Sequence, residues 1–175
     1  MYCYYFKMQY YEKCFITVGT TRFDLLCQQV MSTNVLQALK KIGCKTIVFQ
    51  IGKSDVEPGD YELEGIKLYL YRFKDSIKDD IRNSDFVISH AGAGSCLEVL
   101  SANKPLLVVV NEDLMDNHQL ELAEQLQIDG HLYYCTCDTL QCTVEEVDFS
   151  ALAPFPKADP EPFFKALDSV FRVET

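Results

Sequence analysis

The residues with the clearest chemical potential lie together in one short stretch, residues 87–98 (VISHAGAGSCLE). An apolar segment there runs directly into a turn with two glycines, Gly92 and Gly94, and then into a helix-compatible stretch. Glycine lets a backbone approach a ligand closely and adopt positive φ at little cost. The first free N–H groups of a helix, with the positive end of its dipole, bind anions. The stretch therefore predicts a site for phosphate oxygens built from backbone donors.

Other interpretations of the same stretch remain open. It is neither a Walker loop nor a GxGxxG fingerprint, since neither pattern is complete. Ser95 and Glu98 have the S-x-x-E spacing of a capping box, whose only role would be to start the helix. His90 alone is more often a hydrogen-bonded structural histidine than a ligand contact. Cys96 could act as a nucleophile with His90 or His118 as base, but no GxSxG elbow or cysteine-hydrolase signature surrounds it.

Short apolar segments that would position this stretch recur along the chain. They cover residues 14–18, 46–50, 66–71, 86–89, 106–110 and 132–135, and most lack the polar alternation of a strand with one wet face. Strands of a parallel sheet with helices on both faces have this pattern. Helix-compatible stretches lie between several of them, at 23–42, 75–83, 95–102 and 117–128. The order predicts an α/β fold, a Rossmann-like doubly wound parallel sheet whose ligands bind at the carboxyl ends of the strands.

Two regions interrupt the alternation. Residues 52–65 contain Pro58, Gly59 and several acids, and we expect a surface loop there. The segment after Cys142 is acidic and then proline-rich, and it ends in apolar residues whose spacing places them on one face of a terminal helix: Phe163, Phe164, Leu167, Val170 and Phe171. That helix either packs on its own domain or docks another chain. The expected division is an extension at 1–13, a domain at 14–142 and this segment at 143–175.

Composition narrows the possible partners. The chain has 175 residues, 48% of them apolar, and a net charge of −10, which fits one globular domain and disfavours nucleic acid as a partner. The longest apolar run, residues 106–110, is far shorter than the roughly 20 residues of a membrane span. Residues 1–13 do not resemble a signal peptide, so we expect a cytoplasmic protein with reduced, mostly buried cysteines. Cys135, Cys137, Cys142 and His131 lack the spacing of a zinc site, and we expect no metal.

A family resemblance rests on three groups of residues: H-x-G-x-G-S-x-x-E at 90–98, Lys104-Pro105-Leu106, and residues 116–119 (DNHQ). Together they resemble the donor-binding half of GT-B glycosyltransferases of family 28, such as the bacterial peptidoglycan N-acetylglucosaminyltransferase. Residues 15–24 with 89–95 are most similar to its eukaryotic relatives, which add the second sugar to the dolichol-linked oligosaccharide. The resemblance covers about residues 14–137.

The resemblance implies a role for particular positions. The loop that cradles the diphosphate of the UDP-sugar corresponds to His90, Gly92, Ala93, Gly94 and Ser95. Glu98 corresponds to the acid that takes the ribose hydroxyls, as a carboxylate accepting two O–H donors should. The segment Asn117, His118 and Gln119 corresponds to the sugar contacts, and Gly19 and Thr20 to a turn near the phosphates and the acceptor. Leu122 stands where the bacterial enzyme has an asparagine, so no role is transferred there.

The resemblance also implies a reaction and a partner. The chain has the length of only one of the two GT-B domains, so a membrane-anchored subunit would supply the acceptor half and recruit this chain to the cytosolic face of the endoplasmic reticulum. UDP-N-acetylglucosamine would be the donor and a lipid-linked N-acetylglucosamine diphosphate the acceptor, with inversion at the anomeric carbon. No DxD motif is present, so we expect no metal or cofactor. The general base is unassigned. The alternatives are a non-catalytic sugar-nucleotide-binding regulatory module and an unrelated α/β hydrolase or scaffold.

Overall fold

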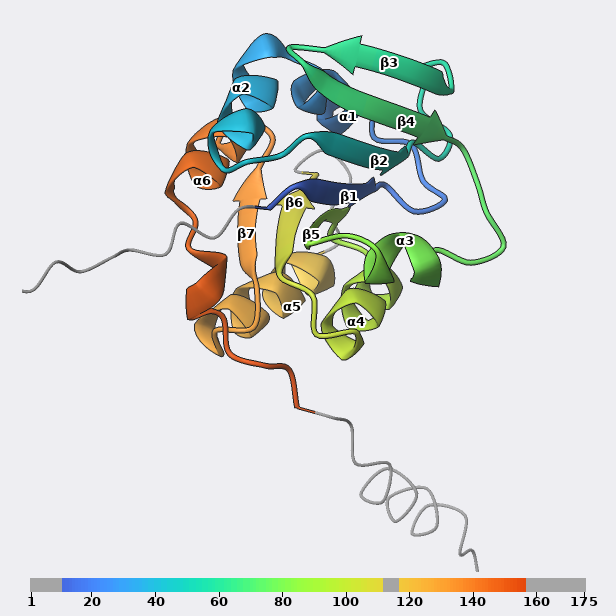
Figure 1. Cartoon of the computed structure of the whole chain (residues 1–175). Coiled ribbons are helices and arrows are strands. Elements are labelled where there is room, and N and C mark those ends of the chain that lie inside the picture. The colour runs from blue at the N-terminus through green and yellow to red at the C-terminus, as the bar shows by residue number, and fades with distance from the viewer. Residues whose placement is uncertain (1–10, 112–116, 157–175) are drawn as a thin grey trace, which may run out of the picture.

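The computed structural model describes residues 11–111 and 117–156, and the side chains of 117–119 are outside that description (Figure 1). One seven-stranded sheet organises the described residues, in the order β3-β4-β2-β1-β5-β6-β7. Its strands are β1 (Lys13–Thr17), β2 (Thr46–Gln50), β3 (Gly59–Leu63), β4 (Ile66–Tyr71), β5 (Phe86–His90), β6 (Leu106–Val110) and β7 (Tyr133–Thr136). All neighbouring strands are parallel except β3, which runs antiparallel to β4.

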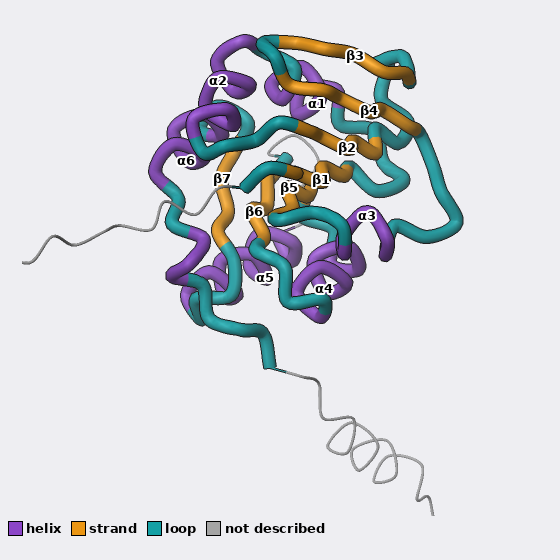
Figure 2. Tube along the Cα trace, viewed as in Figure 1, coloured by secondary structure: helices purple, strands orange, loops and turns teal. Residues whose placement is uncertain are grey.

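Helices cover both faces of the sheet. Figure 1 and Figure 2 show α1 (Asp24–Val30), α2 (Thr33–Lys41) and α6 (Leu140–Glu146) over one face, and α3 (Lys78–Arg82), α4 (Ala93–Ser101) and α5 (Asn117–Ile128) over the other. A short 3-10 turn follows at Phe149–Ala151. Each face has its own apolar core, one around Phe49 and Leu26 and the other around Phe15 and Val99. Two covered faces explain why all five residues of β6 are buried.

The strand order defines where a ligand can bind. Without β3, the order β4-β2-β1-β5-β6-β7 is that of a Rossmann fold, in which the chain reverses its direction of winding between its first and fourth parallel strands. These are β1 and β5, which pair with Thr17 opposite Ser89. A crevice opens outside the carboxyl ends of the strands at such a switch point. The stretch after β5 therefore lies where a ligand-binding edge is expected.

The predicted α/β fold is confirmed, and six strands lie where the apolar segments predict them. The helix-compatible stretch at 23–42 forms two helices, α1 and α2, because Ser32 caps α2 by accepting the Val35 N–H. The loop expected at 52–65 is wrong in part, since it contains the edge strand β3. Glu64 and Gly65 have positive φ and turn the chain from β3 into β4.

Several expectations concern residues that the structure does not describe. Residues 1–10 of the extension expected at 1–13, and the terminal helix expected at 163–171, lie outside the described residues, whereas Tyr11 packs in the core and β1 begins at Lys13. Helix α6 crosses residue 142, the expected end of the domain, and packs on the same core as α2. Among the described helices, none is long and apolar enough to cross a membrane. Every described cysteine is a free thiol, and all but Cys142 are buried, as predicted.

Candidate functional site

Helix α4 begins immediately after β5. Gly92 is its N-cap in an extended conformation, and the Cys96 N–H donates to the Gly92 carbonyl over 3.0 Å. The preceding three N–H groups, of Ala93, Gly94 and Ser95, donate no hydrogen bond to any described residue. Together with the helix dipole, such groups attract an anion. The backbone donors that the sequence predicts are therefore in place.

The two glycines of the turn have different roles, and neither has the positive φ that the sequence led us to expect. A Cβ at Gly92 would lie 2.3 Å from the His90 Nε2 atom, so that position has no room for a side chain. A Cβ at Gly94 would meet no protein atom within 4 Å. Glycine within a helix costs about 1 kcal/mol relative to alanine. Nothing in the described chain requires it at Gly94, which leaves the helix terminus open to a ligand.

The capping-box alternative is wrong. A capping box needs its serine at the N-cap, but Gly92 holds that position and Ser95 is the third residue of the helix. No side chain caps the helix. The Ser95 hydroxyl and the Glu98 carboxylate make no hydrogen bond or ion pair with the described residues, and both line the same cavity. They are available to a ligand.

A second glycine turn, after β1, meets the first one. Gly19 has φ +62°, and its N–H donates to the Thr17 Oγ1 atom over 2.9 Å. A Cβ on Gly19 would lie 2.7 Å from the Cε1 atom of His90. Both the conformation and the contact require glycine here. The imidazole of His90 is thus in close contact with the backbones of Gly19 and Gly92.

His90 is held in a partly buried site. Burial lowers the pKa of His90 below its ordinary value, and the backbone of Thr17 opposes that shift. Its Nδ1 atom is buried and makes no hydrogen bond of acceptable geometry with the described residues. The imidazole is therefore neutral at neutral pH in the ligand-free protein. An anion bound beside the imidazole would raise this pKa.

These elements enclose a cavity of about 370 Å³ at the carboxyl ends of the strands. Its lining comes from the turns after β1 and β5, from α4, from the end of β2 and from the loop before α3: Gly19, Thr20, Thr21, Gln50, Lys74, Asp75, Ser76, Ile77, His90, Gly92, Gly94, Ser95 and Glu98. Most of the predicted site residues therefore meet in one place. Ala93 contributes the first backbone position of α4 rather than a lining side chain. Asn117, His118 and Gln119 open α5, and their side chains are outside the described part of the chain.

The sequence did not reveal two parts of this lining, Gln50 and the loop at 74–77. Lys74 brings a positive charge to the cavity of a chain whose net charge is −10. Its Nζ atom lies 2.8 Å from an Asp80 carboxylate oxygen and 4.0 Å from the centre of the Tyr71 ring. The Tyr71 hydroxyl donates to the same carboxylate over 2.7 Å. A polar residue at the end of an otherwise apolar strand is the signal that could have identified Gln50.

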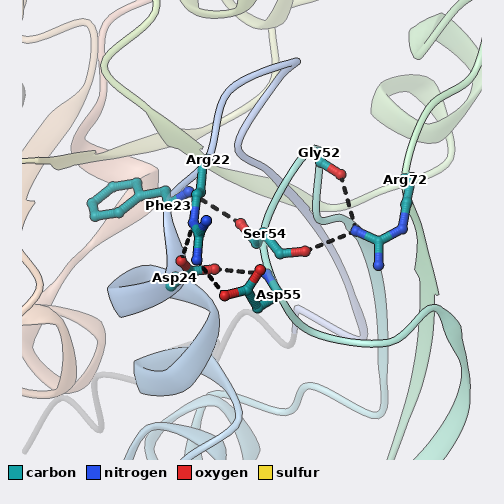
Figure 3. A network of polar contacts seen from close by, with 7 residues as sticks. All are labelled: Arg22, Phe23, Asp24, Gly52, Ser54, Asp55 and Arg72. Carbon is teal, nitrogen blue, oxygen red and sulfur yellow. Dashed lines mark hydrogen bonds and ion pairs between the residues drawn. The ribbon is translucent and has the colours of Figure 1, made fainter.

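A polar network beside the cavity joins three loops (Figure 3). Arg22 pairs with Asp24 and Asp55, and the Asp55 N–H donates to Asp24 over 2.7 Å. Arg72 donates to the Ser54 carbonyl over 2.7 Å, and its second nitrogen reaches the Val56 carbonyl. These contacts join the loops after β1, β2 and β4.

A larger cavity, of about 500 Å³, lies at the opposite, amino-terminal edge of the sheet. It is lined mainly by apolar residues such as Leu100, Leu152 and Phe155. No described cluster of three His, Cys, Asp or Glu side chains could hold a metal ion. Because the unpaired N–H groups at the start of α4 and the predicted site residues meet at the smaller cavity, that cavity is the candidate site.

Comparison with known proteins agrees with this fold. The mostly parallel, Rossmann-like sheet matches the fold of GT-B glycosyltransferases. The chain belongs to the glycosyltransferase family 28 C-terminal domain family, whose model matches residues 13–170. The predicted family resemblance is confirmed.

Individual relatives carry one recurring name, UDP-N-acetylglucosamine transferase subunit ALG13. The human protein is 54% identical over 131 residues, covering 74% of this chain and 12% of its own length. The mouse protein is 52% identical over 131 residues, covering 75% of this chain and 11% of its own. The chain thus spans about a tenth of these mammalian relatives. The Cryptococcus neoformans protein of the same name is 30% identical, covering 89% of this chain and 94% of its own length.

Solved structures agree on the fold. An NMR solution structure of ALG13 has a TM-score of 0.67 at 27% identity, covering 91% of this chain and 96% of its own. The crystal structure of MurG from Acinetobacter baumannii has a TM-score of 0.57 at 18% identity, covering 80% of this chain and 42% of its own. The second likeness supports the fold alone.

Proposed function

We propose that this chain is the donor-binding, catalytic subunit of a two-subunit inverting N-acetylglucosaminyltransferase. It transfers N-acetylglucosamine from UDP-N-acetylglucosamine to dolichyl-diphosphate-N-acetylglucosamine, an early step in N-glycan precursor synthesis. The family and the recurring name of the relatives support this proposal. The observation that carries it is the set of unpaired N–H groups at the start of α4, which open into a cavity shared with the Glu98 carboxylate.

The spacing on α4 suits a nucleoside diphosphate. Ser95 and Glu98 are three residues apart and lie on one face of the helix. A ligand that places its diphosphate on the N–H groups of Ala93, Gly94 and Ser95 can offer its ribose hydroxyls to Glu98, about one turn further along. The turn at Gly19 and Thr20 forms the other wall of the cavity, beside the phosphates. The roles of Asn117, His118 and Gln119 in holding the sugar rest on the family resemblance.

The reaction requires charge stabilisation more than covalent chemistry. The acceptor hydroxyl forms a bond to C1 of the donor sugar while the bond from C1 to the β-phosphate oxygen breaks, and the hydroxyl proton passes to a general base. The departing diphosphate gains negative charge. Preorganised N–H donors at the α4 terminus stabilise that charge, with typical effects of about 3 kcal/mol for a well-aimed donor. We place the general base on the acceptor side, in the partner subunit.

The partner would complete the GT-B architecture. We propose that a membrane-anchored subunit contributes the acceptor-binding half and brings this chain to the cytosolic face of the endoplasmic reticulum membrane. The segment with Phe163, Phe164, Leu167, Val170 and Phe171 is the proposed docking element, and it lies outside the described residues.

A transfer assay tests the function. Labelled UDP-N-acetylglucosamine and a lipid-linked N-acetylglucosamine diphosphate are supplied to this chain with and without the partner subunit. We expect a lipid carrying two sugars only when both subunits are present. Donor binding without transfer in the reconstituted pair would instead indicate a regulatory sugar-nucleotide-binding module. Equal affinity for UDP and uridine would contradict the diphosphate site itself.

A further inference from the structure

A row of buried polar side chains crosses the sheet beneath the cavity. Gln50 on β2, Thr17 on β1 and Ser89 on β5 are 5%, 0% and 0% exposed, respectively. The strand register places Thr17 directly opposite both of the others. The inner strands of a doubly wound sheet are normally apolar, and buried polar groups are costly unless they are hydrogen-bonded. Each hydrogen-bond donor in this row therefore needs an acceptor.

Thr17 links the Gly19 turn to the Gln50 amide. The Gly19 N–H donates to the Thr17 Oγ1 atom over 2.9 Å, and the Thr17 hydroxyl donates to the Gln50 Oε1 atom over 2.6 Å. The amide oxygen of Gln50 therefore faces Thr17, and Nε2 is turned away from it.

The Nε2 group of Gln50 donates to no described residue, although the residue is 95% buried. Gln50 lines the candidate cavity, and Nε2 is not among the described polar atoms that are fully buried without a partner, so it is reached from the cavity. A ligand in the cavity could accept hydrogen bonds from it.

The position of Gln50 indicates which part of the ligand it meets. The strand order places the carboxyl ends of β2, β1 and β5 side by side, so Gln50, the turn at Gly19 and His90 follow one another along the cavity, and α4 with Glu98 comes after β5. A nucleoside diphosphate with its ribose at Glu98 would then extend its terminal phosphate toward Gln50. The cavity lining beside Gln50 includes Lys74 and Asp75 from the loop after β4, the strand that pairs with β2. An amide N–H suits a negatively charged oxygen as its acceptor.

We propose that Gln50 is a ligand-binding residue whose Nε2 donates to an oxygen of the β-phosphate of a nucleoside diphosphate. The assignment rests on the proposed function, because it takes the orientation of the nucleotide from the diphosphate and ribose sites on α4. Thr17 is a positioning residue that holds the amide by its oxygen.

The test uses Gln50→Glu and the ligands UMP and UDP. The carboxylate keeps an acceptor for the Thr17 hydroxyl but replaces the two N–H donors with a second oxygen. At about pH 8 we expect the UDP affinity to fall about tenfold or more, as for the loss of one hydrogen bond to a charged group, while UMP affinity stays within about twofold. A carboxyl group buried at this position has a raised pKa and regains an O–H donor as it protonates. The UDP deficit relative to wild type should therefore shrink at about pH 5.5 with no parallel change for UMP, whereas a purely structural defect would change the affinities for both ligands together.

Gln28→Glu, an exposed substitution of the same type on α1, controls for the added charge. If Gln50→Glu does not fold, Gln50→Met removes both polar atoms and should show the same selective loss for UDP without the pH dependence. In the wild-type protein, the side-chain amide resonance of Gln50 should shift with UDP and not with UMP. Unchanged UDP affinity, equal losses for both ligands, or an unmoved resonance would overturn the assignment. If the wild-type protein gains no affinity from UMP to UDP, the proposed diphosphate site fails as well.

Discussion

At the scale of single residues, the site depends on its glycines as much as on its polar side chains. Gly19 and Gly92 make room for the His90 imidazole, whereas Gly94 faces open space. The first two positions are set by the fold, whereas the third has no packing reason among the described residues.

Replacing these glycines by alanine should separate fold from binding. Gly94→Ala adds a methyl group without a clash and removes helical glycine, so it should stabilise the protein by about 0.5–1 kcal/mol. The same methyl group would stand in the path of the diphosphate and should weaken UDP binding about tenfold or more. Gly92→Ala should destabilise the protein because its Cβ would overlap His90. Urea unfolding and calorimetric titration with UDP measure both effects, and a Gly94→Ala protein with wild-type UDP affinity would contradict the site.

The lowered pKa of His90 predicts opposite effects of acid on stability and on binding. A histidine whose pKa is lower in the folded state contributes stability that is fully present above its unfolded pKa, about 6.5, and is lost as the pH falls toward its folded pKa. A bound diphosphate raises the same pKa, so UDP should bind more tightly as the pH falls through this window. Unfolding and UDP titrations between about pH 5.5 and 7.5 measure the two trends. The same experiments on His90→Gln show the part of the pH dependence that comes from protonation of the nucleotide. If stability and UDP affinity change with pH equally in the wild type and in His90→Gln, the prediction is contradicted.

Glu98 should matter for binding and not for folding, since no capping box forms. Glu98→Gln should change the free energy of unfolding by less than about 0.5 kcal/mol, as surface substitutions usually do. It should weaken UDP binding several-fold and weaken binding of the 2′-deoxy nucleotide less, because that ligand lacks one of the hydroxyls that Glu98 would accept. Titration of the wild-type and Glu98→Gln proteins with UDP and with its 2′-deoxy form measures how far the effect of the substitution depends on the 2′-hydroxyl. A loss of stability with unchanged UDP affinity would show that Glu98 has a structural role instead.

At the scale of elements, the sequence predicts the strands that are buried on both faces. It does not predict features that depend on residues far away along the chain. The six parallel strands were predictable because helices on both faces make them continuous apolar runs. Strand β3 was missed because Gly59–Leu63 (GDYEL) is an edge strand with only partly buried apolar residues. The start of α4 was misplaced because Ser95 and Glu98 have cap-like spacing, although the helix begins two residues before Ser95. The bond from Thr17 to Gln50 joins residues 33 positions apart, which no local pattern reveals.

The loop after β2 offers a prediction at this scale. The guanidinium of Arg72 donates to carbonyls of Ser54 and Val56, whereas the exposed Arg22 makes ion pairs at the surface. Arg72→Met should release the loop at 52–56 and speed hydrogen exchange of its amides about tenfold. Arg22→Ala should change stability by less than about 1 kcal/mol, the usual limit for exposed ion pairs. Equal protection of the loop in wild type and Arg72→Met would show that other contacts hold it.

At the scale of the whole molecule, this chain has the fold of one half of a GT-B enzyme, and the acceptor half is proposed to come from a partner. Phe164→Asp with Phe171→Asp should abolish co-purification with the acceptor-binding subunit, since two charges would stand on the apolar face of the proposed helix. UDP affinity and melting temperature should stay as in the wild type if the helix serves only to dock the partner. Intact co-purification of a folded double variant would exclude this helix as the docking element.

The two ends of the described domain lie away from the cavity. Tyr11, before β1, packs on Phe86 and Phe149, and Phe155 packs on His131, so both ends are at the amino-terminal edge of the sheet. A tag or fusion joined to the described domain at residue 11 or residue 156 would therefore start at the edge of the sheet opposite the candidate cavity.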